Sequence, residues 1–247
     1  MHYVMSDIHG GYEYFRRMLD EIRFSDSDTL YVIGDVIDRG PHNIEMLQFC
    51  RCINNVYLIK GNHEYFMELT ARHPDFASSW YRFGGRTTLG QMDLLLEEEL
   101  QVLFEYVTGL PWMIEVDQTE IPELDRPLLL THTGFLADPD HRMPGFCHPD
   151  LTGEEPFDIA RAVDWWSRHE PYEYSISSDI YQLPDTVRFD RRLIVGHVPV
   201  MSGYVFEPVP YIYEQREYID IDCGCGFRRE GGRLACMRLE DGRIWYR

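Results

Sequence analysis

The polar side chains best suited to chemistry lie in short glycine-containing segments, each directly after a stretch of apolar residues. They offer two carboxylates, one amide oxygen and three imidazoles, on Asp7, His9, Asp35, Asn62, His132 and His197. Oxygen and nitrogen donors together suit Mn²⁺, iron or Zn²⁺ better than Ca²⁺, which prefers oxygen ligands. A closed structural zinc site is a poor fit because these segments contain no cysteine. The set predicts a transition-metal site in which one aspartate can bridge two ions about 4 Å apart.

Alternating strands and helices must bring these segments together. Over the first 65 residues, a β-branched and apolar strand, a polar turn and a helix follow one another three times. We expect strands at 3–5, 29–33 and 56–59, and helices at 11–23, 42–52 and 63–72. Such alternation predicts a parallel sheet, which binds ligands at the carboxyl ends of its strands. Asp7, Asp35 and Asn62 should therefore meet at one edge. There, the gathering of six potential ligands outweighs the simpler role of an aspartate as a helix cap.

The remainder of the chain predicts a second group of strands. They are expected at 112–116, 128–131 and 192–195, and His132 and His197 follow the last two. Alternating residues from 211 to 246 predict an antiparallel second half. Elsewhere we expect an aromatic loop at 74–90, a helix at 90–107, an irregular insertion at 135–157 and a helix at 158–169. Because no linker separates these parts, residues 1–247 are predicted to form one domain.

The order of the polar segments resembles a known family. SDIHG, GDVIDRG and GNHE, followed by His132 and Gly196-His197, are similar to the motifs of the calcineurin-like metallophosphoesterases. GDVIDRG resembles the phosphoprotein phosphatase branch, especially its small bacterial-type members and the related dinucleoside tetraphosphatases. The resemblance covers residues 6–197. It implies a four-layer α/β fold, with two mixed β-sheets packed as a sandwich and flanked by helices.

The resemblance also implies a centre of two metal ions, with Mn²⁺ expected first and iron or Zn²⁺ as alternatives. The first ion would be held by Asp7 and His9, and Asp35 would bridge the two ions. The second ion would be held by Asn62, His132 and His197. A hydroxide shared by the ions would attack phosphorus directly, without a phospho-enzyme.

Four further residues acquire catalytic roles from the same resemblance. His63 would protonate the leaving oxygen, and Asp38 would orient His63. Arg39 would bind the phosphate oxygens through both arms of its guanidinium group. The segment Trp166-Ser167-Arg168 matches one that carries a second phosphate arginine in the family's bacterial type, which assigns that role to Arg168.

The expected substrate is phosphoserine or phosphothreonine on proteins. The alternative is a dinucleoside polyphosphate such as diadenosine tetraphosphate, which requires the same metal ligands. The two substrates would differ in the pocket around 74–90 and 135–157, where stacking aromatic residues in a deep slot would favour the nucleotide. A binding protein without activity is disfavoured because the set of metal ligands and His63 is intact.

Composition excludes other classes of partner. The chain has 42 acidic and 23 basic residues, and its net charge of −19 disfavours binding to nucleic acid or to an anionic membrane. No apolar stretch reaches the 18 or so residues of a membrane span. The start of the sequence lacks the features of a signal peptide, so a cytoplasmic location is expected. The oligomeric state cannot be derived from the sequence.

Two closely spaced cysteine pairs fall outside these motifs: Cys50 with Cys52, and Cys223 with Cys225. In a cytoplasmic protein they are expected to be reduced, and buried thiols are favoured over a redox or soft-metal site. Whether the two pairs meet in space is left open by the sequence.

Overall fold

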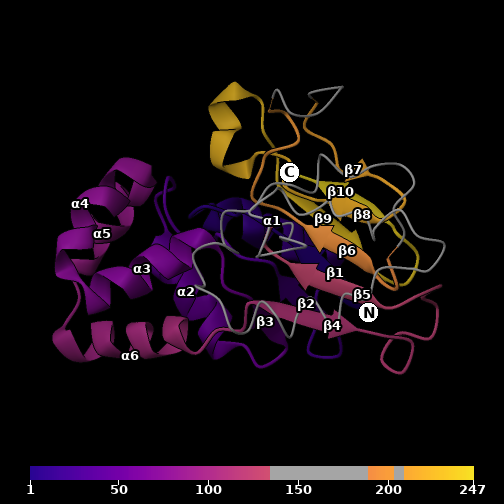
Figure 1. Cartoon of the computed structure of the whole chain (residues 1–247), viewed down its shortest axis with the longest axis horizontal. Coiled ribbons are helices and arrows are strands. Elements are labelled where there is room, and N and C mark those ends of the chain that lie inside the picture. The colour runs from indigo at the N-terminus through magenta and orange to yellow at the C-terminus, as the bar shows by residue number, and fades with distance from the viewer. Residues whose placement is uncertain (134–188, 203–208) are drawn as a thin grey trace, which may run out of the picture.

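The structure is a computed structural model that describes residues 1–133, 189–202 and 209–247 (Figure 1). The described part contains two five-stranded sheets. The first sheet has the order β10-β9-β1-β2-β3. Its strands are β1 (His2–Met5), β2 (Thr29–Val32), β3 (Val56–Leu58), β9 (Ala235–Arg238) and β10 (Ile244–Tyr246). The three N-terminal strands run parallel, as predicted, and β9 joins them antiparallel to β1.

The second sheet has the order β4-β5-β6-β8-β7. Its strands are β4 (Met113–Val116), β5 (Leu128–Thr131), β6 (Arg192–Val195), β7 (Tyr213–Glu214) and β8 (Tyr218–Asp220). The expectation of an antiparallel second half is wrong for its centre, because β5, β6 and β8 run parallel. Every residue of β8 is buried, as is typical of a parallel strand covered on both faces. A strand of three residues carries too little alternation to reveal its direction.

The two sheets pack face to face through alternate residues of each strand. In the first sheet, Val4 and Tyr31 point toward the second sheet, where they meet Leu130 and Ile194. Their neighbours in the chain, such as Met5, point to the opposite face. Two mixed sheets flanked by helices confirm the predicted fold class. That all residues form one domain stays a prediction.

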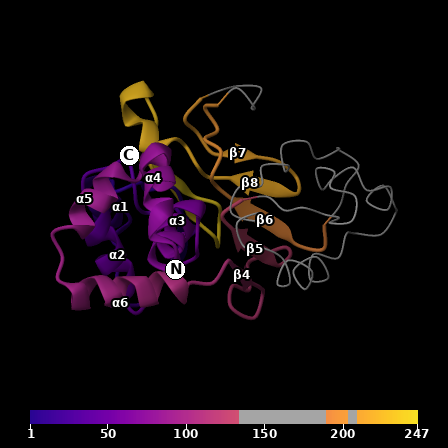
Figure 2. The ribbon, with the colours of Figure 1, turned by 60° about the vertical axis from the view of Figure 1, so that its left-hand side comes forward.

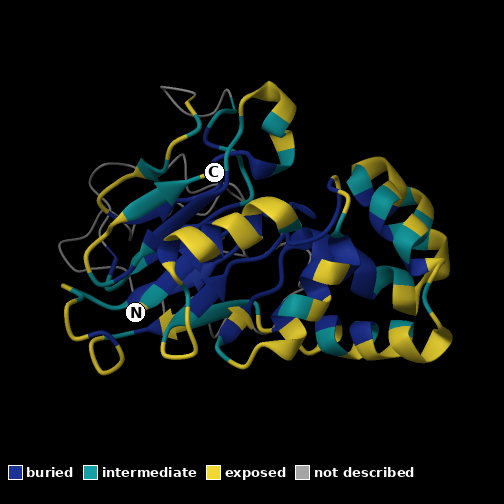
Figure 3. Ribbon diagram, turned by 180° about the vertical axis from the view of Figure 1, so that it is seen from behind, coloured by how far each residue is buried: buried dark blue, intermediate teal, exposed yellow. Residues whose placement is uncertain are grey.

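Helices cover the outer face of the first sheet. α1 (Tyr12–Ile22) and α2 (Asn43–Cys52) bury one face each against it, and α3 (Asn62–Arg72) packs beside α6 (Glu97–Thr108) (Figure 2). Figure 3 shows buried strands and helices that are buried on one side only. No helix in the described ranges has the length and apolarity needed to cross a membrane.

The segment 74–90 differs from its prediction as a loop. It forms a 3₁₀ turn (Pro74–Phe76), α4 (Ala77–Trp80), a wide turn (Tyr81–Gly85) and α5 (Arg86–Met92). The side chain of Trp80 is fully buried and anchors this segment to the core. Trp80 accounts for the order of a segment whose local sequence indicates only a loop.

The helix predicted at 90–107 is divided in two. α5 ends at Met92, and α6 begins only at Glu97. The carboxylate of Glu99 accepts a hydrogen bond of 2.9 Å from the backbone N–H of Leu96, which caps the new helix. Glutamates in a first turn also suit the positive end of the helix dipole. The three consecutive glutamates 97–99 therefore lie exposed in the first turn of α6.

The five described cysteines are free thiols, and all except Cys52 are buried. Burial raises the pKa of the Cys225 thiol to about 12, so the thiol stays protonated near neutral pH. Cys50 and Cys225 belong to one apolar cluster, and Cys223 lies in another. The prediction of buried thiols is thus confirmed for Cys50, Cys223 and Cys225 and is wrong for Cys52, which is exposed.

We expect the interface between the sheets to dominate stability. Leu130→Ala removes a fully buried side chain there and should lower the free energy of unfolding by about 2–5 kcal/mol. Leu94→Ala makes the same change at a side chain that is 84% exposed and should cost no more than about 0.5 kcal/mol. Urea unfolding of both variants measures the difference, and equal losses would contradict the sandwich.

Candidate metal centre

Loops after five strands meet at one place. β1, β2 and β3 are followed by the segments of Asp7, Asp35 and Asn62, and β5 and β6 are followed by His132 and His197. The predicted convergence at the carboxyl ends of parallel strands therefore occurs across both sheets. All six residues predicted as metal ligands lie in this cluster, as the following contacts show.

Asp35 lies at the centre of the cluster. Its Oδ2 atom faces Nε2 of His132 at 3.3 Å, Nε2 of His63 at 3.7 Å and Nε2 of His9 at 3.9 Å. Its Oδ1 atom accepts a hydrogen bond of 3.0 Å from the backbone N–H of His63. Two groups of potential ligand atoms share this carboxylate: Asp35 with His9 and His63, and Asp35 with His132 and His197. One carboxylate shared by two groups is the arrangement that a bridging ligand needs.

Two histidines are fixed with one nitrogen directed into the cluster. Nδ1–H of His9 donates to the carbonyl oxygen of Ile37 at 2.9 Å, and Nδ1–H of His132 donates to that of Ile33 at 2.8 Å. Nε2 of each ring then faces the carboxylate of Asp35. A backbone partner on the remote nitrogen is the usual support of a metal-binding histidine.

Besides Asp35, Asn62 and Asp7 supply oxygen atoms to the cluster. Oδ1 of Asn62 lies 3.1 Å from Nε2 of His132 and 2.9 Å from Nδ1 of His197. Two acceptors as close as Asn62 Oδ1 and His132 Nε2 repel unless a proton or cation lies between them. Oδ2 of Asp7 accepts hydrogen bonds from Ser6 and from the His197 backbone, whereas its buried Oδ1 has no hydrogen-bond partner among the described residues and lies 3.9 Å from Nε2 of His9. These features fit cations as the missing partners.

Burial and mutual charge shift the pKa values of these groups. Burial raises the pKa of Asp7 to about 7. Burial alone would raise the pKa of Asp35 too, but the charges of His132 and His63 hold it well below its usual range. Burial alone would lower the pKa of His132, but Asp35 raises it to about 10. Burial instead lowers the pKa of His9 and lowers that of His197 to about 3, so the central carboxylate favours a proton only on His132 and His63.

A second unit lies beside the cluster. Nδ1–H of His63 donates to Oδ2 of Asp38 at 2.5 Å, and Nε1–H of Trp80 donates to the same oxygen at 2.6 Å. The hydroxyl of Thr88 donates to the other oxygen of Asp38. Burial alone would lower the pKa of His63, but Asp35 and Asp38 together raise it. With Nδ1 held by Asp38, a raised pKa and Nε2 toward the cluster, His63 is suited to proton donation.

Backbone strain is concentrated in the same loops. Seven described residues other than glycine have positive φ angles. Six of them are site residues: Asp7, His9, Asp35, Asp38, Arg39 and His197. Such conformations cost about 1–3 kcal/mol each and persist only where surrounding structure enforces them. This strain indicates that the loops are shaped for ligand binding rather than for stability.

Glu64 is a site residue that the sequence motif contained but that had no assigned role. Its buried carboxylate accepts backbone hydrogen bonds from Asp35 at 2.8 Å, Val36 at 2.9 Å and Gly61 at 2.9 Å. It therefore joins the loop after β2 to the loop after β3. Glu64 is the third residue after the N-cap Gly61 and accepts its N–H, which is the glutamate half of a capping box; a glutamate at this spacing was the available sequence signal.

Arg39 lies at the solvent-exposed side of the cluster. Its backbone N–H donates to the carbonyl oxygen of Gly84 at 3.2 Å, and Nη2 lies 3.4 Å from Nε2 of His63. This position suits the predicted contact with phosphate. Arg168, the second predicted phosphate arginine, lies outside the described residues.

Comparison with known proteins identifies related sequences. The family model described as calcineurin-like phosphoesterase matches residues 3–208. A Vibrio campbellii protein named symmetrical bis(5'-nucleosyl)-tetraphosphatase is 23% identical over 282 residues, covering 98% of this chain and 97% of the relative. A Vibrio cholerae protein of the same name is 25% identical over 275 residues, covering 97% and 95%.

Solved structures show the same fold. A crystal structure provisionally assigned as a diadenosine tetraphosphatase has a TM-score of 0.57 at 18% identity, covering 100% of this chain and 92% of that one. A Saccharomyces cerevisiae protein serine/threonine phosphatase has a TM-score of 0.53 at 15% identity, covering 100% and 78%. The fold is thus common to enzymes with different substrates.

The names of the sequence relatives contradict the expected protein phosphatase. That expectation depended on the metal-ligand motifs, which the two substrate classes share, and therefore could not separate them. The relatives' names support the alternative, a dinucleoside polyphosphate hydrolase. The family model covers most of the length of this chain, and the chain therefore belongs to the calcineurin-like phosphoesterase family.

Proposed function

We propose that this protein hydrolyses dinucleoside tetraphosphates in a reaction that depends on two divalent cations. The substrate class is supported by the relatives of the same name, which match nearly the whole chain. The chemistry is supported by one arrangement above all, the single carboxylate of Asp35 within reach of two sets of imidazoles. Cleavage of the central phosphoanhydride bond would yield two nucleoside diphosphates.

Six side chains are proposed to hold the cations. Asp7 and His9 would hold one, Asn62, His132 and His197 the other, and Asp35 both. The assignment of Asp7 is supported by its Oδ1 atom, which has no hydrogen-bond partner among the described residues. His63 is left out of the ligand set because its ring is hydrogen-bonded to Asp38. Bound cations would stabilise charge on the phosphoryl oxygens and lower the pKa of the attacking water. Mn²⁺ is the first ion to test because it accepts mixed oxygen and nitrogen ligands.

The chain itself would supply orientation and a proton. Arg39 would hold the phosphate oxygens with its planar guanidinium group. When water attacks phosphorus and the bridging P–O bond breaks, Nε2 of His63 would donate a proton to the departing oxygen. Asp38 would retain the Nδ1 proton of His63, and Trp80 and Thr88 would keep Asp38 in place.

The products of diadenosine tetraphosphate test this function directly. With Mn²⁺ present, chromatography should show ADP as the sole nucleotide product, formed at least tenfold faster than phosphate is released from a phosphoserine peptide. Formation of ATP and AMP would contradict cleavage at the central bond. Faster hydrolysis of the phosphopeptide would contradict the substrate class.

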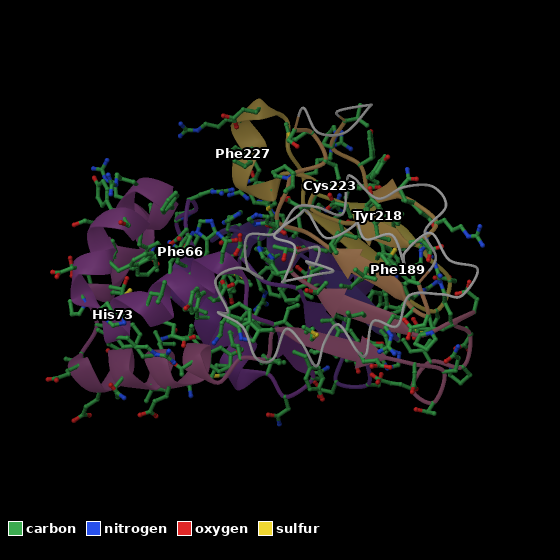
Figure 4. All side chains as sticks on the ribbon, viewed as in Figure 1. Phe66, His73, Phe189, Tyr218, Cys223 and Phe227 are labelled. Atoms are coloured by element: carbon green, nitrogen blue, oxygen red, sulfur yellow. The ribbon has the colours of Figure 1, made fainter. Side chains whose placement is uncertain are left out.

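The role of His63 as an acid predicts a selective loss of rate. His63→Asn should retain its metal content but slow turnover about 10²–10⁴-fold, which is the usual effect of removing a positioned acid. The loss should be greatest for substrates with poor leaving groups. His73→Asn, an exposed histidine just beyond the other end of α3, serves as the control (Figure 4). Equal slowing with every leaving group would count against proton donation.

Glu64 should affect the metal centre without touching a cation. Glu64→Gln places an NH₂ group among three backbone donors and leaves at least one of them unpaired, at a cost of about 1–3 kcal/mol in the free energy of unfolding. Loss of a hydrogen bond from Glu64 to the loop of Asp35 should also displace that loop and so weaken Mn²⁺ binding, as measured by calorimetry. Glu99→Gln alters an exposed cap in the same way and should leave Mn²⁺ binding unchanged. Unchanged binding in Glu64→Gln would refute the positioning role.

A further inference from the structure

We propose that the exposed rings of Phe83 and Phe227 form stacking surfaces for the two nucleobases of the substrate, one on each flank of Arg39. The inference rests on the proposed function, because a dinucleoside tetraphosphate carries a base at either end of its phosphate chain. If the central bond lies at His63, the two nucleosides must extend away from the cluster in different directions. Two separate apolar surfaces beside the phosphate site would then be needed.

Phe227 lies in the 3₁₀ turn Cys225–Glu230, near the end of the chain. This turn lies directly against the cluster, since a Cβ atom added to Gly226 would be 2.6 Å from Cδ2 of His9 and 3.0 Å from Nη1 of Arg39. The guanidinium carbon of Arg39 lies 4.7 Å from the centre of the Phe227 ring. Even so, 37% of Phe227 is exposed. An apolar ring therefore borders the arginine that is proposed to hold phosphate.

Phe83 lies in the turn Tyr81–Gly85 and contacts the site from another part of the chain. Its neighbour Gly84 has φ of 110° and accepts the backbone hydrogen bond of Arg39. The ring of Phe83 stacks on Phe66 with 5.4 Å between centres, and Phe66 contacts His63 edge-on at 5.6 Å. Phe83 is 53% exposed. Its inner face is thus supported by the core while the ring as a whole remains open to a ligand.

The two rings come from turns far apart in the sequence, Tyr81–Gly85 and Cys225–Glu230. Figure 4 labels Phe227 on the C-terminal turn and Phe66, on which Phe83 stacks, on α3. Single exposed aromatic residues are common on protein surfaces and need no special role. Here, however, both exposed rings lie in turns that contact the same arginine, Arg39. Nucleobases bind such rings by stacking, whichever base is present.

The charge around the two rings suits a polyphosphate. The chain has a net charge of −19, yet each turn carries basic residues beside its phenylalanine. These residues are Arg82 in the turn of Phe83, followed by Arg86 at the start of α5, and Arg228 and Arg229 next to Phe227 in the sequence. Arg228 also fixes its turn, because it donates to the sulfur of Cys225 at 2.8 Å and its guanidinium lies 4.6 Å from the ring of Tyr14. Each flank therefore pairs a stacking ring with positive charge.

The test compares ligands with and without a base. Phe83→Ala and Phe227→Ala should each raise the KM for diadenosine tetraphosphate roughly 5–100-fold, the range expected when one stacking platform is lost. Inhibition by ADP should weaken to a similar extent, and inhibition by inorganic pyrophosphate, which has no base, should weaken much less. Phe83→Trp and Phe227→Trp should restore the KM, which a loss of folding in the alanine variants would not predict.

Tyr57→Ala is the matched control, since Tyr57 is an aromatic residue 48% exposed on β3, and it should leave the KM unchanged. If wild-type protein releases ADP from diadenosine tetraphosphate but both alanine variants keep its KM, the stacking surfaces are refuted and the proposed function stands. If equal weakening is found for ADP and pyrophosphate, base recognition is likewise refuted. If wild-type protein releases no ADP, the proposed function fails and the inference fails with it.

Discussion

A single buried carboxylate surrounded by imidazoles is the constraint on which the rest of the site depends. Asp35 faces His9, His63 and His132, and the loops that carry these residues start from different strands. The sandwich must therefore align the ends of two sheets before the cluster exists. Glu64 joins two of these loops by accepting hydrogen bonds from three backbone N–H groups. Six of the site residues have positive φ angles. The strained loops thus lower the free energy of unfolding, and the packed sheets and helices beneath them offset this loss.

Much of this arrangement could be predicted from the sequence, because strand-end motifs such as GDVIDRG combine strong local signals with a known resemblance. Other features depend on distant contacts. The order of residues 74–90 depends on the burial of Trp80, and the parallel direction of β8 depends on its pairing with β6. The three backbone bonds of Glu64 likewise exist only after folding. The metal roles of the clustered residues, and the phosphate role of Arg168, stay predictions.

The substrate class shows where motif reasoning ends. Metal ligands and a proton donor are needed for any phosphate transfer to water, so the same motifs accompany peptide and nucleotide substrates. Discrimination depends instead on what surrounds Arg39, and there the sequence indicated only an aromatic loop. The two turns that flank this arginine come from residues 81–85 and 225–230, which no local pattern connects.

The pairing of β1 with β9 has a consequence for the synthesis of the protein. Residues 3–5 emerge from the ribosome more than 200 residues ahead of their partners, residues 236–238. The first sheet therefore stays incomplete until residue 238 has been translated, and contacts of such long sequence separation form slowly. Shortened chains that lack residues 236–238 should therefore leave one edge of β1 unpaired.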